Sequence, residues 1–209
     1  MTSGFRQLNL WADEEERLHK CLRLALQALQ KEKIVQASDD ELVISGKLRP
    51  HIRRVKRRVI PYWTFHSEVS AFDEADDPIP VGHPDFQFSI IDNEKNQIDY
   101  DIEAKRVRVK DGTSKMDHCK AYVINGINRY VKGVYGQSVP FGAMLGYVQN
   151  SQLPDLLDEV NRSLIAQSQP VINLLGKWKE KGVSFLGHLL NRNPSDGFTL
   201  SHIWADFRK

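Results

Sequence analysis

The N-terminal part of the chain has apolar residues at helical spacing. Within residues 12–33, apolar side chains recur every three or four positions and form one stripe, made of Leu18, Leu22, Ala25 and Leu29, with Cys21 and Leu26 beside it. This pattern predicts a helix that packs on the rest of the protein. We expect its acidic residues 13–16 to lie near the positive end of the helix dipole, and Lys31 and Lys33 near the other end.

A second helix is expected to start near residue 38. Ser38 and Glu41 have the spacing of a capping box, in which the serine side chain caps the helix and the glutamate reaches back to the first backbone N–H. Leu42, Leu48 and other apolar residues could bury one side of this helix. Because proline removes a helical hydrogen bond, we expect Pro50 to divide it into two pieces.

The middle of the chain alternates with a period of two, which is typical of β-strands. Residues 62–72 are rich in aromatic and β-branched side chains, and we interpret Tyr62, Trp63 and Phe65 as core residues. Residues 83–92 place Phe86, Phe88 and Ile90 on one face. A turn at residues 93–96 would join this strand to residues 98–109, so the two are expected to form a hairpin.

The remaining elements complete a mixed α/β pattern. We expect an amphipathic helix over residues 115–132, with Ala121, Ile124 and Val131 on its apolar side, a buried strand over 141–148, and a helix over 153–168. Residues 183–190 and 198–207 would form a closing hairpin. The sequence therefore predicts one α/β domain over residues 1–209, made of an N-terminal packing helix (1–37), a core (38–149), and a C-terminal helix and β-hairpin (150–209).

The strand at residues 98–109 has a row of charges on one face. Side chains two residues apart share a face, so Asp99, Asp101, Glu103 and Lys105 would lie together. Adjacent carboxylates about 6.6 Å apart would repel by roughly 2.5 kcal/mol at an effective dielectric constant of about 20. The row is either the solvated face of an antiparallel strand or a place where a bound cation turns repulsion into attraction.

Composition narrows the classes of protein only slightly. The chain has 209 residues, 41% of them apolar, and a net charge of +2. It has no run of about eighteen apolar residues and no secretion-signal pattern at its start, so no membrane association is expected. Cys21 and Cys119 fall inside expected helices and do not have the spacing of metal ligands. These features favour a reducing, cytoplasmic environment.

One segment is densely basic. Residues 49–58, RPHIRRVKRR, carry six cations in ten positions. Such a run could contact a nucleic-acid backbone without reading its sequence, or it could be a solvated face or a surface for an acidic partner. We interpret it as a backbone contact made by Arg53, Arg54, Lys56, Arg57 and Arg58.

The pair Pro84-Asp85, followed after a hairpin-length interval by Glu103-Ala104-Lys105, resembles the PD-(D/E)XK motif of the restriction-endonuclease-like nuclease superfamily. The order strand, strand, helix, strand around these residues matches as well, over about residues 38–149. The resemblance implies a restriction-endonuclease-like mixed β-sheet flanked by helices. It also implies that Asp85 and Glu103 bind Mg²⁺ or Mn²⁺ and that Lys105 positions the attacking water, in hydrolysis of DNA phosphodiesters.

The same superfamily often adds an acidic residue from a helix before the sheet. Glu41 is our candidate for this third metal ligand, with its capping-box role as the alternative, and Glu68 is a weaker rival. The segments YVINGINRYVKGVYG (122–136) and GAMLGYV (142–148) also resemble small nucleases of bacterial antiphage defence. Arg129 and Lys132, one turn apart in the first of these, could meet a phosphate, or they could be solvated or bond to the last helical carbonyls.

The expected function is therefore metal-dependent cleavage of nucleic acid, with DNA favoured over RNA. Such a protein could act as the effector of an antiphage defence system, with a second copy of the chain or a larger ATPase or sensor subunit as partner. The alternatives are a catalytically silent nucleic-acid-binding module and a structural subunit of a larger complex, in which the charged row is surface.

Overall fold

The computed structural model describes residues 3–67, 83–91, 97–109, 117–136, 139–192 and 197–208, referred to below as the described residues. Its helical elements are α1 (Ser3–Glu32), α2 (Glu41–Val59), α3 (His118–Ala121), the π-helix η1 (Tyr122–Ile127), α4 (Asn128–Val131) and α5 (Leu153–Ile165). Its strands are β1 (Thr64–Ser67), β2 (Phe86–Ile91), β3 (Gln97–Val107), β4 (Phe141–Val148), β5 (Asn173–Leu174), β6 (Val183–Leu190) and β7 (Phe198–Asp206).

The strands form one seven-stranded mixed sheet in the order β1-β2-β3-β4-β7-β6-β5. The two expected hairpins are confirmed, since β2 pairs antiparallel with β3 and β6 pairs antiparallel with β7. The centre of the sheet is parallel, with β4 between β3 and β7. Only the short strand β5 had no sequence signal, because two residues are too few for a period to be visible.

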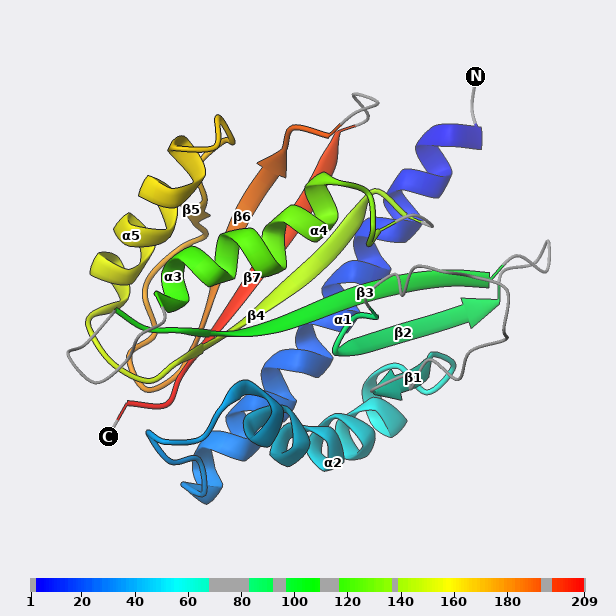
Figure 1. Ribbon diagram of the computed structural model, residues 1–209. Coiled ribbons are helices and arrows are strands. Elements are labelled where there is room, and N and C mark those ends of the chain that lie inside the picture. Colours follow the sequence, from blue (N-terminus) through cyan, green and yellow to red (C-terminus); the bar gives the residue numbers. More distant parts are fainter. Residues whose placement is uncertain are drawn as a thin grey trace, which may run out of the picture.

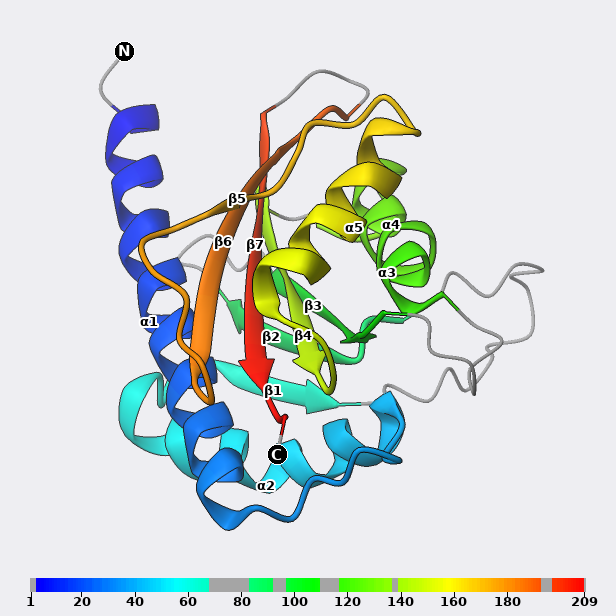
Figure 2. The ribbon, with the colours of Figure 1, turned by 90° about the vertical axis from the view of Figure 1, so that its left-hand side faces the viewer.

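Helices cover both faces of the sheet (Figures 1 and 2). On one face, α1 and α2 pack against each other and on the sheet, and the expected stripe of α1 is buried there from Leu18 to Leu29. On the other face, α5 and the helix that runs through α3, η1 and α4 enclose a second apolar core. The mixed α/β architecture with flanking helices is thus confirmed.

The first helix is longer than its apolar stripe predicts, and this changes the role of its acidic residues. Because α1 begins at Ser3, residues 13–16 lie inside the helix and not in its first turn, so the expected dipole interaction is wrong. Glu14 instead accepts hydrogen bonds from the Tyr62 hydroxyl and the Trp63 indole, at 2.9 Å each. Trp63 is buried as expected, Phe65 packs on the core, and Tyr62 is 47% exposed, contrary to expectation.

The second helix is capped and continued differently from the prediction. Asp40, not Ser38, is the N-cap residue, and its side chain accepts from the Val43 N–H at 2.9 Å. Pro50 does not divide the helix, which runs unbroken to Val59. Pro50 lies on the exposed side, where the carbonyl that loses its helical partner can bond to water. Leu42 is exposed as well, so its predicted burial is wrong.

The helix expected over residues 115–132 contains a π-helical segment. In η1 the hydrogen bonds span five residues instead of four, which rotates the following residues relative to an uninterrupted α-helix. The buried positions include Tyr122, Gly126 and Tyr130, whereas Ile124 of the predicted apolar stripe is 43% exposed. Gly133, with φ of +70°, follows the end of α4, and this left-handed conformation is typical of a glycine that ends a helix.

Some expectations lie outside the described residues. Of the strand predicted over 62–72, the structure describes β1. Glu68, the turn 93–96 and the start of the helix predicted from 115 are among the residues not described. Among the described residues, no helix is both long enough and apolar enough to cross a membrane.

Candidate active site

Strand β3 carries Glu103 and Lys105 on the face of the sheet that α4 covers. Their neighbour Ala104 points into the opposite core, as the alternation predicts. In the register with β4, Glu103 lies beside Met144, which belongs to the core under α4. The Glu103 residue is 2% exposed, so this end of the charged row is not a solvated strand face.

The Lys105 ammonium lies among three carboxylates. Its Nζ is 2.6 Å from Glu103 Oε1, 3.2 Å from Glu41 Oε1 and 3.9 Å from Asp85 Oδ2. These acidic residues come from β3, from the start of α2 and from the residue that precedes β2. The structure thus brings together all four residues that the sequence analysis assigned to catalysis or to the metal.

Asp85 is held in place by the hairpin. The register pairs Phe86 with Ile102, so Asp85, one residue earlier, lies next to the β3 segment that contains Glu103. Its Oδ2 also accepts a hydrogen bond of 2.7 Å from the Ala104 N–H. This contact anchors the carboxylate at the edge where β2 begins.

Glu41 reaches the site because another residue caps its helix. As Asp40 is the N-cap, the Glu41 side chain is not engaged in a capping box, and that interpretation is wrong. The side chain extends to β3, where Oε2 accepts a hydrogen bond of 3.4 Å from the Arg106 N–H. The Glu41 carboxylate, at the N-terminus of α2, is therefore the third carboxylate close to Lys105.

Arg129 on α4 contacts the same cluster from above the sheet. Its Nη1 lies 3.3 Å from Glu103 Oε1 and also donates a hydrogen bond to the Tyr135 hydroxyl. The guanidinium carbon lies 5.4 Å from the centre of the Tyr135 ring. Arg129 is therefore neither fully solvated nor bonded to the last helical carbonyls. Tyr135 was not identified from the sequence, because an isolated aromatic residue after a helix has no distinguishing signal.

Burial and like charge make Glu103 costly to ionise. The pKa of Glu103 is raised to about 7. Burial is the largest cause and the Asp85 carboxylate is the second, whereas Lys105 and Arg129 lower the pKa. Burial also raises the pKa of Asp85, against the opposing effects of Lys105 and the Ala104 N–H. A shared positive charge would lower the cost of keeping both carboxylates ionised.

The surroundings of Lys105 favour its charged form, whereas those of Glu103 disfavour its charged form. Burial on its own would lower the pKa of the ammonium, but Glu103, Glu41 and Asp85 outweigh it and raise the pKa above the usual value. The lysine is therefore protonated at neutral pH. It can hold a water or a phosphate oxygen by charge and hydrogen bonding, but it cannot remove a proton in this state.

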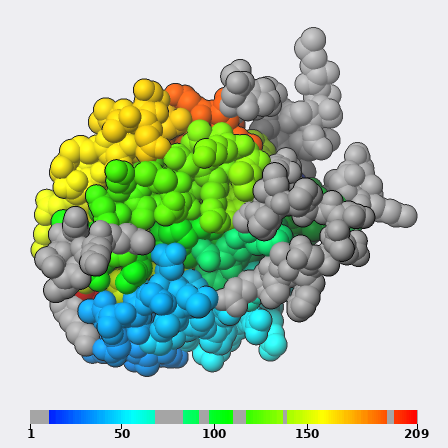
Figure 3. Space-filling model, in the orientation of Figure 1, coloured from blue at the N-terminus to red at the C-terminus, as the bar shows by residue number. Residues whose placement is uncertain are grey.

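A surface hollow of about 460 Å³ opens next to the cluster. It lies where the start of α2 adjoins the α3–α4 helix, and Figure 3 shows these two surfaces meeting. It is lined by Asp40, Glu41, Leu42, Lys105, Arg106, His118, Ala121, Asn125 and Arg129. His118 also lines this hollow, and nothing in the sequence indicates that role. The hollow gives a ligand access to Lys105 and Arg129.

The donor set fits a hard divalent cation in its chemistry. Among the described residues, no three histidine, cysteine, aspartate or glutamate side chains already have the spacing of a metal site. The carboxylates of Glu41, Asp85 and Glu103 instead surround the Lys105 ammonium. Mg²⁺ and Mn²⁺ prefer carboxylate oxygens, and Mg²⁺ usually takes one or two of them together with waters and phosphate oxygens. The residues present can supply that set.

The other two acids of the charged row have structural partners. Asp101 accepts hydrogen bonds from the Gln87 amide and the Gly136 N–H, both at 2.9 Å. Asp99, which is half-buried, accepts from the Ser89 hydroxyl at 2.6 Å. These bonds join β3 to β2 and to the loop after α4, so only the Glu103 end of the row contributes to the cluster.

The remaining predicted nucleic-acid contacts lie away from the cluster. Arg53, Arg54, Arg57 and Arg58 are exposed on α2, and Lys56 is partly exposed. Lys132 is exposed beyond the end of α4 and does not join Arg129 at Glu103.

The comparisons with known proteins do not assign the chain to a family. No protein-family model, no curated protein and no solved structure matches it. The four-residue cluster is therefore the observation from which a function can be argued.

Proposed function

We propose that the protein is a metal-dependent nuclease, most simply a DNA endonuclease, with a restriction-endonuclease-like fold and a PD-(D/E)XK site. The observation that carries the proposal is the convergence of Asp85, Glu103 and Glu41 on Lys105. A structural surface has no need for three carboxylates around one largely buried ammonium, because each buried charge costs free energy. A site that binds a cation and a phosphate does need them.

In this proposal, Asp85, Glu103 and Glu41 would hold Mg²⁺ or Mn²⁺ next to the hollow. When bound, the cation supplies Lewis-acid polarisation of the scissile phosphate and neutralises charge that builds up on its oxygens. The strand β3 is a rigid mount for Glu103 and Lys105, which suits a reaction whose parts must be placed to about half an ångström.

Two cationic side chains would act on the substrate itself. The protonated Lys105 donates hydrogen bonds, so it can orient the attacking water in line with the phosphorus. Arg129 lines the same hollow and presents a planar guanidinium that can bind phosphate oxygens. Tyr135, through its hydrogen bond to Arg129, keeps that guanidinium at the site.

The direct test is cleavage of supercoiled plasmid and linear DNA in Mg²⁺, in Mn²⁺ and in EDTA, with single-stranded RNA as a parallel substrate. We expect Glu103→Ala and Lys105→Met to lower the rate by at least about a hundredfold, the usual effect of removing a group that acts in the chemical step. Asp99→Asn is the matched control, because it changes a carboxylate on the same strand and face outside the cluster. Equal cleavage by the wild type and Glu103→Ala would exclude this function.

A catalytically silent nucleic-acid-binding module is the second candidate. It is favoured by one observation, that the Lys105 ammonium already forms ion pairs with the carboxylates at the place where a cation would bind. This candidate predicts nucleic-acid binding that survives chelation, with no turnover in any divalent metal. Metal-dependent cleavage that Lys105→Met removes would reject it.

A further inference from the structure

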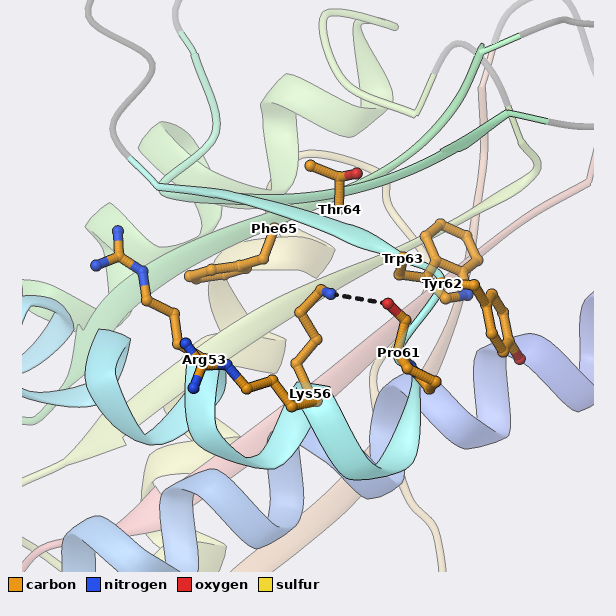
Figure 4. A pocket seen from close by; sticks show the side chains of 8 residues that line it. Arg53, Lys56, Pro61, Tyr62, Trp63, Thr64 and Phe65 are labelled. Carbon is orange, nitrogen blue, oxygen red and sulfur yellow. Dashed lines mark hydrogen bonds between the residues drawn. The ribbon is translucent and has the colours of Figure 1, made fainter.

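A second hollow, of about 310 Å³, lies between the C-terminal half of α2 and strand β1. We call it the α2–β1 pocket, and it is lined by Arg53, Lys56, Arg57, Pro61, Tyr62, Trp63, Thr64 and Phe65. Figure 4 shows Phe65 beside Arg53 at one end and Tyr62 at the other, with Lys56 and Pro61 between them. The pocket therefore combines cations with aromatic rings at a site separate from the candidate active site.

The pocket presents positive charge that the described part of the protein does not neutralise. Within that part, the Arg53 and Arg57 guanidinium groups have no ion pair or side-chain hydrogen bond, and both residues are exposed. Lys56 donates a hydrogen bond of 3.3 Å to the Pro61 carbonyl, which fixes its ammonium in the pocket but leaves its charge uncompensated. Three cations within two turns of one helix favour an anionic ligand.

The aromatic residues of the pocket are held in defined positions. Tyr62 is 47% exposed, yet its hydroxyl donates to Glu14 and accepts from Arg17 at 2.6 Å, so the ring is anchored to α1. Phe65 is partly exposed and stacks on Phe86, with ring centres 5.9 Å apart. Anchored rings next to cations are the combination by which proteins bind single-stranded nucleic acid, whose bases stack on the rings.

One side of α2 connects the two hollows. Leu42 lines the active-site hollow, and Gly46, Arg53 and Arg57 follow it at intervals that keep the same side of a 3.6-residue helix. Gly46 is exposed, and a Cβ built there would meet no atom of the described residues within 4 Å, so this position on the helix is open. From Leu42 to Arg53 the helix rises roughly 16 Å, the length of about five stacked nucleotides.

We propose that the α2–β1 pocket binds an unpaired nucleotide of the nucleic-acid strand that is cut at the candidate active site. This nucleotide lies about five nucleotides from the scissile phosphate. The phosphate would contact Arg53, Lys56 and Arg57, and the base would stack on Tyr62 or Phe65. The substrate is then a nucleic acid with a single-stranded segment, held along α2. This inference rests on the proposed function for the identity of the strand, and it adds the second site and the single-stranded character.

The test measures binding by fluorescence anisotropy in EDTA, where no cleavage can occur, with labelled oligothymidylates of four and twelve nucleotides and a blunt twelve-base-pair duplex. We expect Arg53→Ala/Arg57→Ala to weaken binding of the twelve-nucleotide strand about tenfold or more. Arg54→Ala/Arg58→Ala is the matched control, because it removes the same charge from positions about 100° around the helix. Equal losses in the two double variants would overturn the proposal.

Further variants test the stacking of the base on Tyr62 or Phe65 and the course of the strand along α2 over Gly46. Tyr62→Leu/Phe65→Leu should weaken binding of the twelve-nucleotide strand about fivefold or more, in line with the loss of base stacking. The same double variant should change binding of an abasic strand little; an equal loss for the abasic strand would overturn the base contact. Gly46→Phe, which places a ring on the path, should weaken binding of the twelve-nucleotide strand more than that of the four-nucleotide strand, with Gly46→Ala as control.

The outcomes separate this inference from the proposed function. If no metal supports cleavage but the Arg53/Arg57 and abasic results are as expected, the pocket stands and the nuclease assignment fails. If cleavage depends on Glu103 but the two arginine double variants behave alike, the nuclease stands and the pocket fails. Tighter binding of the blunt duplex than of the single strand would also overturn the single-stranded assignment.

Discussion

Replacing the buried Glu103 carboxylate with an amide should make the metal-free protein more stable at neutral and alkaline pH, at the expense of activity. Glu103 is 2% exposed, and its pKa is raised to about 7 from an ordinary value of 4.5. Below pH 4.5 the group is protonated in the folded and the unfolded state alike. Between pH 4.5 and 7 the folded state binds more protons than the unfolded state, so stability falls as the pH rises.

The size of the effect follows from the difference between the two pKa values. That difference is about 2.5 pH units, and at 1.36 kcal/mol per unit it corresponds to roughly 3 kcal/mol. Glu103→Gln does not ionise, so it does not lose this free energy. We therefore expect the free energy of unfolding of the variant, relative to the wild type, to increase by about 3 kcal/mol between pH 4.5 and pH 8.

The assay is urea unfolding in EDTA at pH 4.5, 6, 7 and 8 for the wild type, Glu103→Gln and the control Asp99→Asn. Because all three proteins share their other titrating groups, the difference between their curves isolates the substituted carboxyl. Parallel curves for the wild type and Glu103→Gln, within about 1 kcal/mol, would refute the claim that the folded protein raises the pKa of Glu103. Added Mg²⁺ should then stabilise the wild type and Asp99→Asn, but not Glu103→Gln, by about 2.7 kcal/mol at a hundred times the dissociation constant.

Three further predictions concern the fold around the site. Gly146→Ala should destabilise the protein by about 1–3 kcal/mol, because a Cβ there would lie 2.4 Å from a carbon of the buried Trp204 indole; thermal unfolding against Gly46→Ala, which meets open space, measures this. Tyr130→Phe should cost about 1–2 kcal/mol in urea unfolding, since the buried hydroxyl bonds to two backbone carbonyls at 2.8 and 2.9 Å, and an unchanged midpoint would contradict it. Burial lowers the pKa of His188 to about 4, so the unfolded state binds more protons between pH 4 and 6.5 and stability falls as the pH drops through that window; His188→Gln should flatten this slope between pH 6.5 and 4.5.

The short-range pattern of the sequence was sufficient to predict the helices and strands and to identify part of the candidate active site. Alternation identified β2 and β3, and the turn between them implied antiparallel pairing. If Asp85 begins its strand and the hairpin folds back, Asp85 can lie near Glu103, and the register of the structure pairs the two strands in this way. The third member, Lys105, follows from its position two residues after Glu103 on the same strand.

Other features of the site were accessible only as alternatives. Glu41 fitted a capping box as well as a metal ligand, because both patterns place an acidic residue in the first turn of a helix. The structure decides between them through Asp40, which caps α2 and leaves the Glu41 side chain to contact Lys105. That contact depends on how α2 docks against β3, which no local pattern encodes.

By itself, the sequence determined the order of helices and strands, the two hairpins and the pairing of Asp85 with the Glu103–Lys105 strand, because periodicity and turn chemistry are local properties. Only the tertiary structure decided that Glu103 is buried, that α2 and α4 bring Glu41 and Arg129 to it, and that a cationic pocket forms between α2 and β1. These features depend on packing between elements distant in the chain, and burial, charge and access are set by that packing.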